Sequence, residues 1–198
     1  MKNKKSEIKG EKINGAFTSF ESNKRGSWRL LESIIRRFRN LAFMLMIMPL
    51  AILSAFLVGL AVSPGFFIVL KVYYGTKDQS FWFHVISMIS AFGLGFLAFI
   101  LTLIFAVPAA NFLLPLRVKH LRGVAYSLET IPWYFHNALT YLVRYTILDF
   151  ITPTPLNILF FRMMGMKIGK GVILNTSNIS DPCRIEIEDF VTVGGSAT

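Results

Sequence analysis

Two long stretches without a charged side chain constrain this chain most. No Asp, Glu, Lys or Arg occurs between Arg39 and Lys71, or between Asp78 and Arg117. A membrane-spanning helix needs about 20 apolar residues, and both stretches are longer than that. Eleven residues of 41–61 and thirteen of 85–105 are Leu, Ile, Phe or Val. The sequence therefore predicts a two-helix transmembrane hairpin over residues 40–122.

The limits of the two spans are predicted from turn-forming and polar residues. Ser63-Pro64-Gly65 is expected to end the first helix, and the polar residues 71–78 to form the turn. Tyr73, Tyr74 and Trp82 flank that turn, as in an aromatic belt at a membrane interface. With 54% hydrophobic and 16% charged residues, the composition excludes a disordered chain and disfavours an ordinary soluble domain.

The distribution of basic residues predicts the orientation of the hairpin. Lys and Arg number six in 24–39, two in 71–78 and three in 117–122. Cytoplasmic flanks carry the excess of Lys and Arg. We therefore expect a multi-pass protein of the cytoplasmic (inner) membrane with both termini cytoplasmic. The net charge of +10 then serves topology and anionic headgroups, and no nucleic-acid partner is expected.

Two segments precede the hairpin: a tail expected in solvent and a helix expected at the membrane surface. Residues 1–26 are polar and basic without periodicity, which predicts a disordered tail. Residues 27–39 place Trp28, Leu31, Ile35 and Phe38 at helical spacing beside arginines. This pattern predicts an amphipathic helix in the interface of an anionic bilayer. The alternative is a solvated helix that supplies only charge for topology.

A further amphipathic helix is predicted for residues 123–151. His136, Asn137, Thr140 and Arg144 fall on one polar arc at 3.6 residues per turn. An interfacial helix is favoured over a third span, because Arg144 and Asp149 oppose burial in lipid. The polar arc, including His136, is expected to face solvent or headgroups.

The composition changes to β type after Thr152-Pro153. Three hexads share an aliphatic first residue and a small or β-branched fifth residue, and short repeats of this kind are typical of a parallel β-helix. The hexad positions are Ile168, Gly169, Val172, Ile187, Val191, Val193, Gly194 and Ala197. The alternative is a small β-hairpin. Residues 152–198 are thus expected to form a partial β-helix.

These hexads and the segment before them resemble the hexapeptide-repeat acyltransferases, which fold as left-handed parallel β-helices. The lead-in Phe161-Arg162-Met-Met-Gly-Met-Lys-Ile-Gly169 is similar to the family's "aromatic-Arg-x-x-Gly-x-Lys-Ile-Gly" segment. The Asp181-Pro182 corner followed by Ile187-Glu-Asp189 is also similar to that family. The order of membrane hairpin, amphipathic segment and β-helix resembles the C-terminal regions of some nonribosomal peptide synthetases of the poly-lysine synthetase type.

The resemblance implies a fold and an activity. The expected fold is a helical hairpin and amphipathic helix followed by the first one to two coils of a left-handed β-helix. Family members transfer an acyl group from a thioester such as acetyl-CoA, which would be a co-substrate and not a permanently bound cofactor. They assemble as trimers through the β-helix, so the resemblance implies a homotrimer. A histidine acts as general base in a later coil, but no histidine follows His136 in this chain.

Two functions remain open on the sequence. The first is a membrane-anchored acyltransferase whose chain is truncated or one part of a split protein, because the stretch from Ile168 to Thr198 holds fewer than two coils. That chain alone is expected to be inactive, with His136 as a weak catalytic candidate. The second is a non-catalytic membrane anchor or interaction module for a partner enzyme.

Other chemical sites are not supported by the sequence. His84 and His120 are expected to lie at the membrane interface. The carboxylates Asp181, Glu186, Glu188 and Asp189 are expected to be solvated. Cys183 has no nearby His that could activate it. No pair of histidines has metal-ligand spacing, so no metal site is predicted.

Overall fold

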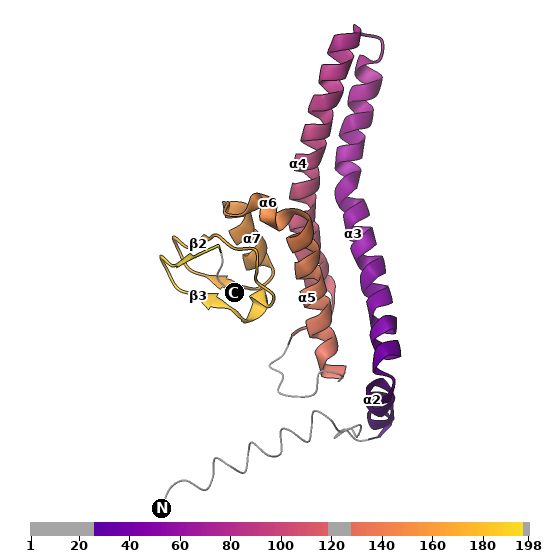
Figure 1. Ribbon diagram of the computed structural model, residues 1–198, viewed down its shortest axis with the longest axis vertical. Coiled ribbons are helices and arrows are strands. Elements are labelled where there is room, and N and C mark those ends of the chain that lie inside the picture. The colour runs from indigo at the N-terminus through magenta and orange to yellow at the C-terminus, as the bar shows by residue number, and fades with distance from the viewer. Residues whose placement is uncertain (1–25, 119–127, 196–198) are drawn as a thin grey trace, which may run out of the picture. The chain divides into compact units, whose positions relative to one another are not determined.

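The structure is a computed structural model that describes residues 26–118 and 128–195. The described chain is mostly helical, with four two-residue strands in its C-terminal part (Figure 1). It divides into two compact units, one of residues 26–50, 116–118 and 128–135, the other of residues 51–115 and 136–195. The predicted tail, His120 and hexad position Ala197 lie outside the described residues.

The first unit contains helix α2, Ser27–Arg37, and the beginning of α3. On α2, Glu32 and Arg36 are buried and form an ion pair of 2.8 Å. The large apolar side chains of α2 are instead exposed, with Trp28 60% accessible. The helix predicted for 27–39 is therefore present, and its apolar face is open.

Helices α3, Arg39–Thr76, and α4, Phe81–Leu113, run side by side and are joined by a short turn (Figure 1). By length and composition, both are able to cross a membrane. In the most apolar 18-residue stretch of each helix, only 6% is buried in α3 and 28% in α4. A core helix of a soluble protein would be mostly covered, so this exposure favours membrane helices.

The break predicted at Ser63-Pro64-Gly65 is wrong, because α3 continues through these residues to Thr76. Pro64 lacks an N–H, so the carbonyl of Leu60 loses its helical donor. The Ser63 hydroxyl donates to that carbonyl at 2.8 Å. Such local replacement lets proline remain inside membrane helices. The turn is correspondingly shorter than predicted and lies between Thr76 and Phe81.

Two contacts fix the register of the hairpin. A Cβ on Gly65 would lie 2.8 Å from the carbonyl oxygen of Gly95, so the two backbones touch there. Eleven residues further along α3 and eleven back along α4, Thr76 Oγ1 and His84 Nδ1 are 2.8 Å apart. The helices are thus antiparallel in constant register, and residues 55–75 lie opposite 85–105. The candidate span Asn40–Thr76 contains both the predicted stretch 41–61 and the part of α3 that faces α4.

After α4, the chain forms a second helical stretch. Helix α5, Ile131–Val143, passes into the π-helical turn Arg144–Leu148 and the short α6, Asp149–Ile151. This is the described part of the helix predicted for 123–151. Its apolar residues Leu139, Val143, Ile147 and Leu148 are buried in the same cluster as Leu103 of α4.

Helix α7, Pro155–Met163, connects this stretch to the strands. Proline at its first position is compatible with the helix because that N–H would have no partner. The helix ends before Gly165, whose φ of +99° suits a residue without a side chain. Phe160 and Phe161 are fully buried. Burial of a large apolar side chain contributes about 1.5–3 kcal/mol to stability, so these two residues hold α7 against the core.

The strands form two parallel pairs with the same offset along the chain. Strand β1, Lys167–Ile168, pairs with β3, Glu186–Ile187, and β2, Ile173–Leu174, pairs with β4, Thr192–Val193. Position 167 is matched with 186 and position 173 with 192, so the offset is equal in both pairs. The chain therefore makes one circuit and returns beside its own start.

Candidate functional site

His136 occupies a buried position where α5 contacts α4. Only 3% of the residue is accessible. Its Nδ1 lies 3.0 Å from Oδ1 of Asn111 near the end of α4. A carboxamide oxygen can only accept, so this geometry places the imidazole proton on Nδ1 and leaves the lone pair on Nε2. Nε2 has no hydrogen-bond partner among the described residues.

The surroundings keep this imidazole neutral. Burial lowers the pKa of His136 below its usual value, and the positive charge of Arg184 acts in the same direction. The carboxylate of Asp181 opposes the shift more weakly than burial favours it. A neutral histidine with one nitrogen oriented by a hydrogen bond has the protonation state of a general base.

The expected orientation is therefore wrong for three of the four residues of the polar arc, and Arg144 alone is not buried. His136, Asn137 and Thr140 are all buried, whereas the sequence predicted that they face solvent or headgroups. The Thr140 hydroxyl donates to the backbone oxygen of His136 at 2.9 Å. His136 bonds to α4 and Thr140 to its own helix, so these bonds replace water in part. Asn137 Oδ1 has no hydrogen-bond partner among the described residues.

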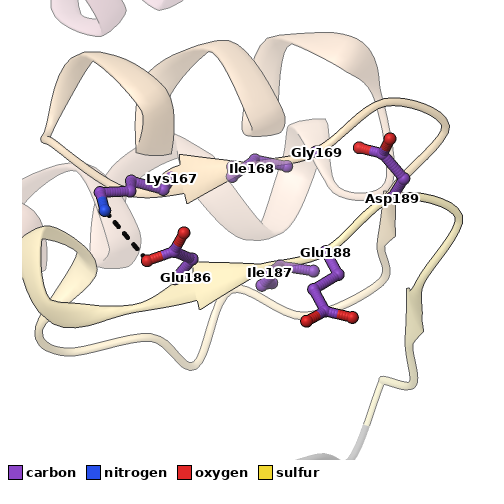
Figure 2. A pocket seen from close by; sticks show the side chains of 7 residues that line it. All are labelled: Lys167, Ile168, Gly169, Glu186, Ile187, Glu188 and Asp189. Carbon is purple, nitrogen blue, oxygen red and sulfur yellow. Dashed lines mark hydrogen bonds and ion pairs between the residues drawn. The ribbon is translucent and has the colours of Figure 1, made fainter.

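A second feature is an open pocket of about 590 Å³ along strands β1 and β3. Figure 2 shows Lys167 and Glu186 facing each other across the two strands, where Nζ and Oε2 are 3.0 Å apart. Glu188 and Asp189 line the other part of the pocket. Asp189 accepts the backbone N–H of Lys170 at 2.7 Å. The charges are exposed and mostly acidic.

The aliphatic residues at the three hexad starts lie in the two strand pairs. Ile168 lies beside Ile187, and Val193 beside Leu174, in the two strand pairs. These four side chains and Val172 belong to or pack on the hydrophobic core. Val191 departs from the pattern, because 36% of it is exposed.

The two hexad glycines differ in their surroundings. A Cβ on Gly169 would lie 2.6 Å from the backbone nitrogen of Asp189, so only glycine fits there. Nothing lies within 4 Å of a Cβ placed on Gly194.

The remaining candidate residues do not form a reactive group. His84 contacts Thr76 in the hairpin. Cys183 is a free thiol whose pKa is raised by burial, which makes it a poor nucleophile. Within the described residues, no three His, Cys, Asp or Glu side chains are grouped to hold a metal ion.

Two asparagines were not singled out by sequence reasoning. Asn111 orients His136. Asn157 is fully buried on α7, and its Nδ2 donates to Leu174 of β2 at 3.2 Å and to Thr152 Oγ1 at 2.8 Å. The sequence signal for Asn157 is its position as a lone amide in an apolar stretch, Leu156-Asn157-Ile158.

No protein-family model, no curated protein and no solved structure gives a significant match.

Proposed function

We propose that this protein is a membrane-anchored module of the hexapeptide-repeat acyltransferase type. In this proposal α3 and α4 span the membrane and hold the beginning of a left-handed β-helix at its cytoplasmic face. The single observation that carries the proposal is the equal offset of the two parallel strand pairs, from 167 to 186 and from 173 to 192. Three hexads make 18 residues, one fewer than this offset, and the irregular turn Pro182–Arg184 lies in the stretch that both circuits share.

The lead-in segment supports the same proposal. Arg162 on α7 donates from Nη2 to the backbone oxygens of Ile168 at 3.0 Å and Gly169 at 2.9 Å. These bonds connect the helix before the strands to the first corner of the coil. The arginine of the family-like segment thus has a structural role that explains its spacing from the Ile-Gly pair.

The membrane part of the proposal rests on exposed apolar surface. The most apolar parts of α3 and α4 are mostly uncovered. Trp28 and Ile34 on α2, and Phe38 directly after it, are more than half exposed. Buried in lipid, such side chains stabilise the inserted state at roughly 25 cal/mol per Å². We place α2 in the headgroup region of an anionic bilayer and the hairpin turn on the opposite side.

The chemistry would be transfer of an acyl group from a thioester to an amine or hydroxyl. The acceptor attacks the thioester carbonyl, its proton passes to a base, and the thiol leaves after taking up a proton. His136 Nε2 has the required lone pair. The donor, such as acetyl-CoA, is a substrate, and a trimer of β-helices remains a prediction.

A second function, a non-catalytic anchor for a partner enzyme, is favoured by one observation. With only 3% of His136 exposed, substrate reaches Nε2 only if the surrounding side chains move. On this alternative His136 and Asn111 are a buried polar contact between α5 and α4.

A transfer assay separates the two functions. The full chain in lipid vesicles is given labelled acetyl-CoA and a panel of amines and alcohols, beside His136→Gln and the coil-surface control Lys170→Ala. Transfer that His136→Gln reduces about 100-fold or more, the usual contribution of a general base, supports catalysis. Absence of transfer in all three proteins is the result expected of this chain alone, and the anchor is then the function that this chain itself performs.

A further inference from the structure

An arginine and two tyrosines form a cluster at the end of α5 and the beginning of the π-helical turn that follows it. The guanidinium carbon of Arg144 is 5.6 Å from the centre of the Tyr141 ring and 5.4 Å from that of Tyr145. The two rings are 5.7 Å apart. Within the described residues, Arg144 has no hydrogen-bond or ion-pair partner, so its five N–H donors are available.

The π-helical turn Arg144–Leu148 explains why the cluster faces outward. Ile147 and Leu148 at the end of this turn are fully buried, whereas Tyr145 is 74% exposed. Short π-helical segments often occur at functional sites. The apolar side of the turn fixes the backbone, and the arginine and tyrosines are presented away from the core.

Two contacts give the direction of this helix relative to α4. His136 contacts Asn111, and the rings of Phe150 and Phe96 are 5.3 Å apart. Between these two contacts the chain advances from His136 to Phe150 on one stretch and goes back from Asn111 to Phe96 on the other. The two separations along the chain differ by only one residue. The two stretches therefore run antiparallel, nearly residue for residue.

This register places Arg144 at a particular depth. Arg144 is eight residues beyond His136, which corresponds to Leu103 on α4. If Trp82 marks the membrane boundary at the hairpin turn, a hydrocarbon core of about 30 Å takes about 20 residues at 1.5 Å each and ends near Thr102. Arg144 thus lies where the opposite hydrocarbon boundary meets the headgroups.

We propose that Tyr141, Arg144 and Tyr145 form a binding site for the phosphate of a membrane phospholipid. The planar guanidinium binds phosphate oxygens with two parallel hydrogen bonds. The tyrosine rings hold it in one orientation, and tyrosine is favoured at this depth of a bilayer. The inference rests on the proposed membrane insertion of α3 and α4.

Lipid retention of the full chain, measured by native mass spectrometry from detergent, tests the proposal. The probes are phosphatidylglycerol and a digalactosyl-diacylglycerol with the same acyl chains but no phosphate. We expect Arg144→Ala to weaken phosphatidylglycerol retention about tenfold, the effect of one lost charge-assisted hydrogen bond. Retention of the galactolipid should not change. Arg144→Lys, which keeps the charge without the fork, should fall between Arg144→Ala and the unmodified chain.

The matched control is Lys170→Ala, which removes one positive charge from the coil surface and should leave retention unchanged. Equal retention in Arg144→Ala and the unmodified chain overturns the proposal, as does equal loss for both lipids. Displacement of the lipid by millimolar inorganic phosphate would show a site for free phosphate instead. Failure of the chain to fractionate with membranes would contradict the proposed function itself and is scored separately by flotation.

Discussion

Gly65 and Gly95 set the distance between the two long helices at the scale of single residues. The α-carbons of the pair face each other without side chains, and Ala61 and Ala91 stand one turn before each glycine and are buried. In lipid no hydrophobic effect drives helices together, so close backbone packing of small residues is the main source of association. One methyl group added at this contact should therefore lower the stability of the hairpin.

Gly65→Ala should destabilise the hairpin, whereas Gly59→Ala should not. A Cβ at Gly65 meets Gly95 backbone at 2.8 Å, but one at Gly59 meets nothing within 4 Å. We expect a loss of about 1–3 kcal/mol from overpacking at Gly65, and a gain of up to about 1 kcal/mol from helix propensity at Gly59. Unfolding in mixed micelles with increasing dodecyl sulfate measures both, and equal stability of the two variants would refute this packing.

The buried imidazole of His136 predicts acid sensitivity. Its pKa is lowered by burial in the folded chain, whereas the unfolded chain takes up the proton near pH 6.5. Stability is therefore complete above that pH and is lost as the pH falls through it. The melting temperature in detergent should drop between pH 7.5 and 5.0, and less in His136→Gln, which can still donate to Asn111. An equal drop in both proteins would place the acid-sensitive group elsewhere.

Among the larger elements, the coil depends on the stacking of two corners. Phe190, at a positive φ of 59°, donates its N–H to the Lys170 oxygen at 2.8 Å. Asp189 accepts from the backbone of Lys170. A Cβ on Gly171 would lie 2.7 Å from the Phe190 ring. The second circuit of the chain therefore rests directly on glycines of the first.

Gly169→Ala should loosen the coil, and Gly194→Ala should leave it intact. A Cβ added at Gly169 would lie 2.6 Å from the backbone nitrogen of Asp189, whereas one added at Gly194 would meet nothing within 4 Å. The amides of Ile173 and Asn175, which donate to Val191 and Val193, should exchange hydrogen at least about tenfold faster in Gly169→Ala only. Unchanged exchange in that variant would mean that the corners do not determine the coil.

The same elements show what sequence reasoning could and could not reach. Charge-free runs predicted the two long helices α3 and α4. The break at Pro64 was wrong because a neighbouring hydroxyl satisfies the carbonyl, which periodicity does not encode. The burial of His136 was missed because an amphipathic pattern shows that a helix has two faces without showing which face is covered.

In the molecule as a whole, a helical hairpin with exposed apolar surface carries a coil attached to its second helix. Helix α7 contacts α4 and both of the first two strands. The buried cluster is continuous from Leu103 on α4 through Phe161 on α7 to Leu174 in β2. If α4 spans the membrane, the coil is held at a fixed distance from the bilayer, which suits an enzyme or partner that works on the membrane surface.

The side of the membrane on which each end of the hairpin lies is the most direct test of this account. Single cysteines are placed at Asp78 in the turn and at Lys170 on the coil, both in a Cys183→Ser background. Intact cells are treated with a membrane-impermeant maleimide before and after lysis. The account predicts that Asp78→Cys labels in intact cells and Lys170→Cys only after lysis. Labelling of Lys170→Cys in intact cells, or of Asp78→Cys only after lysis, would contradict it.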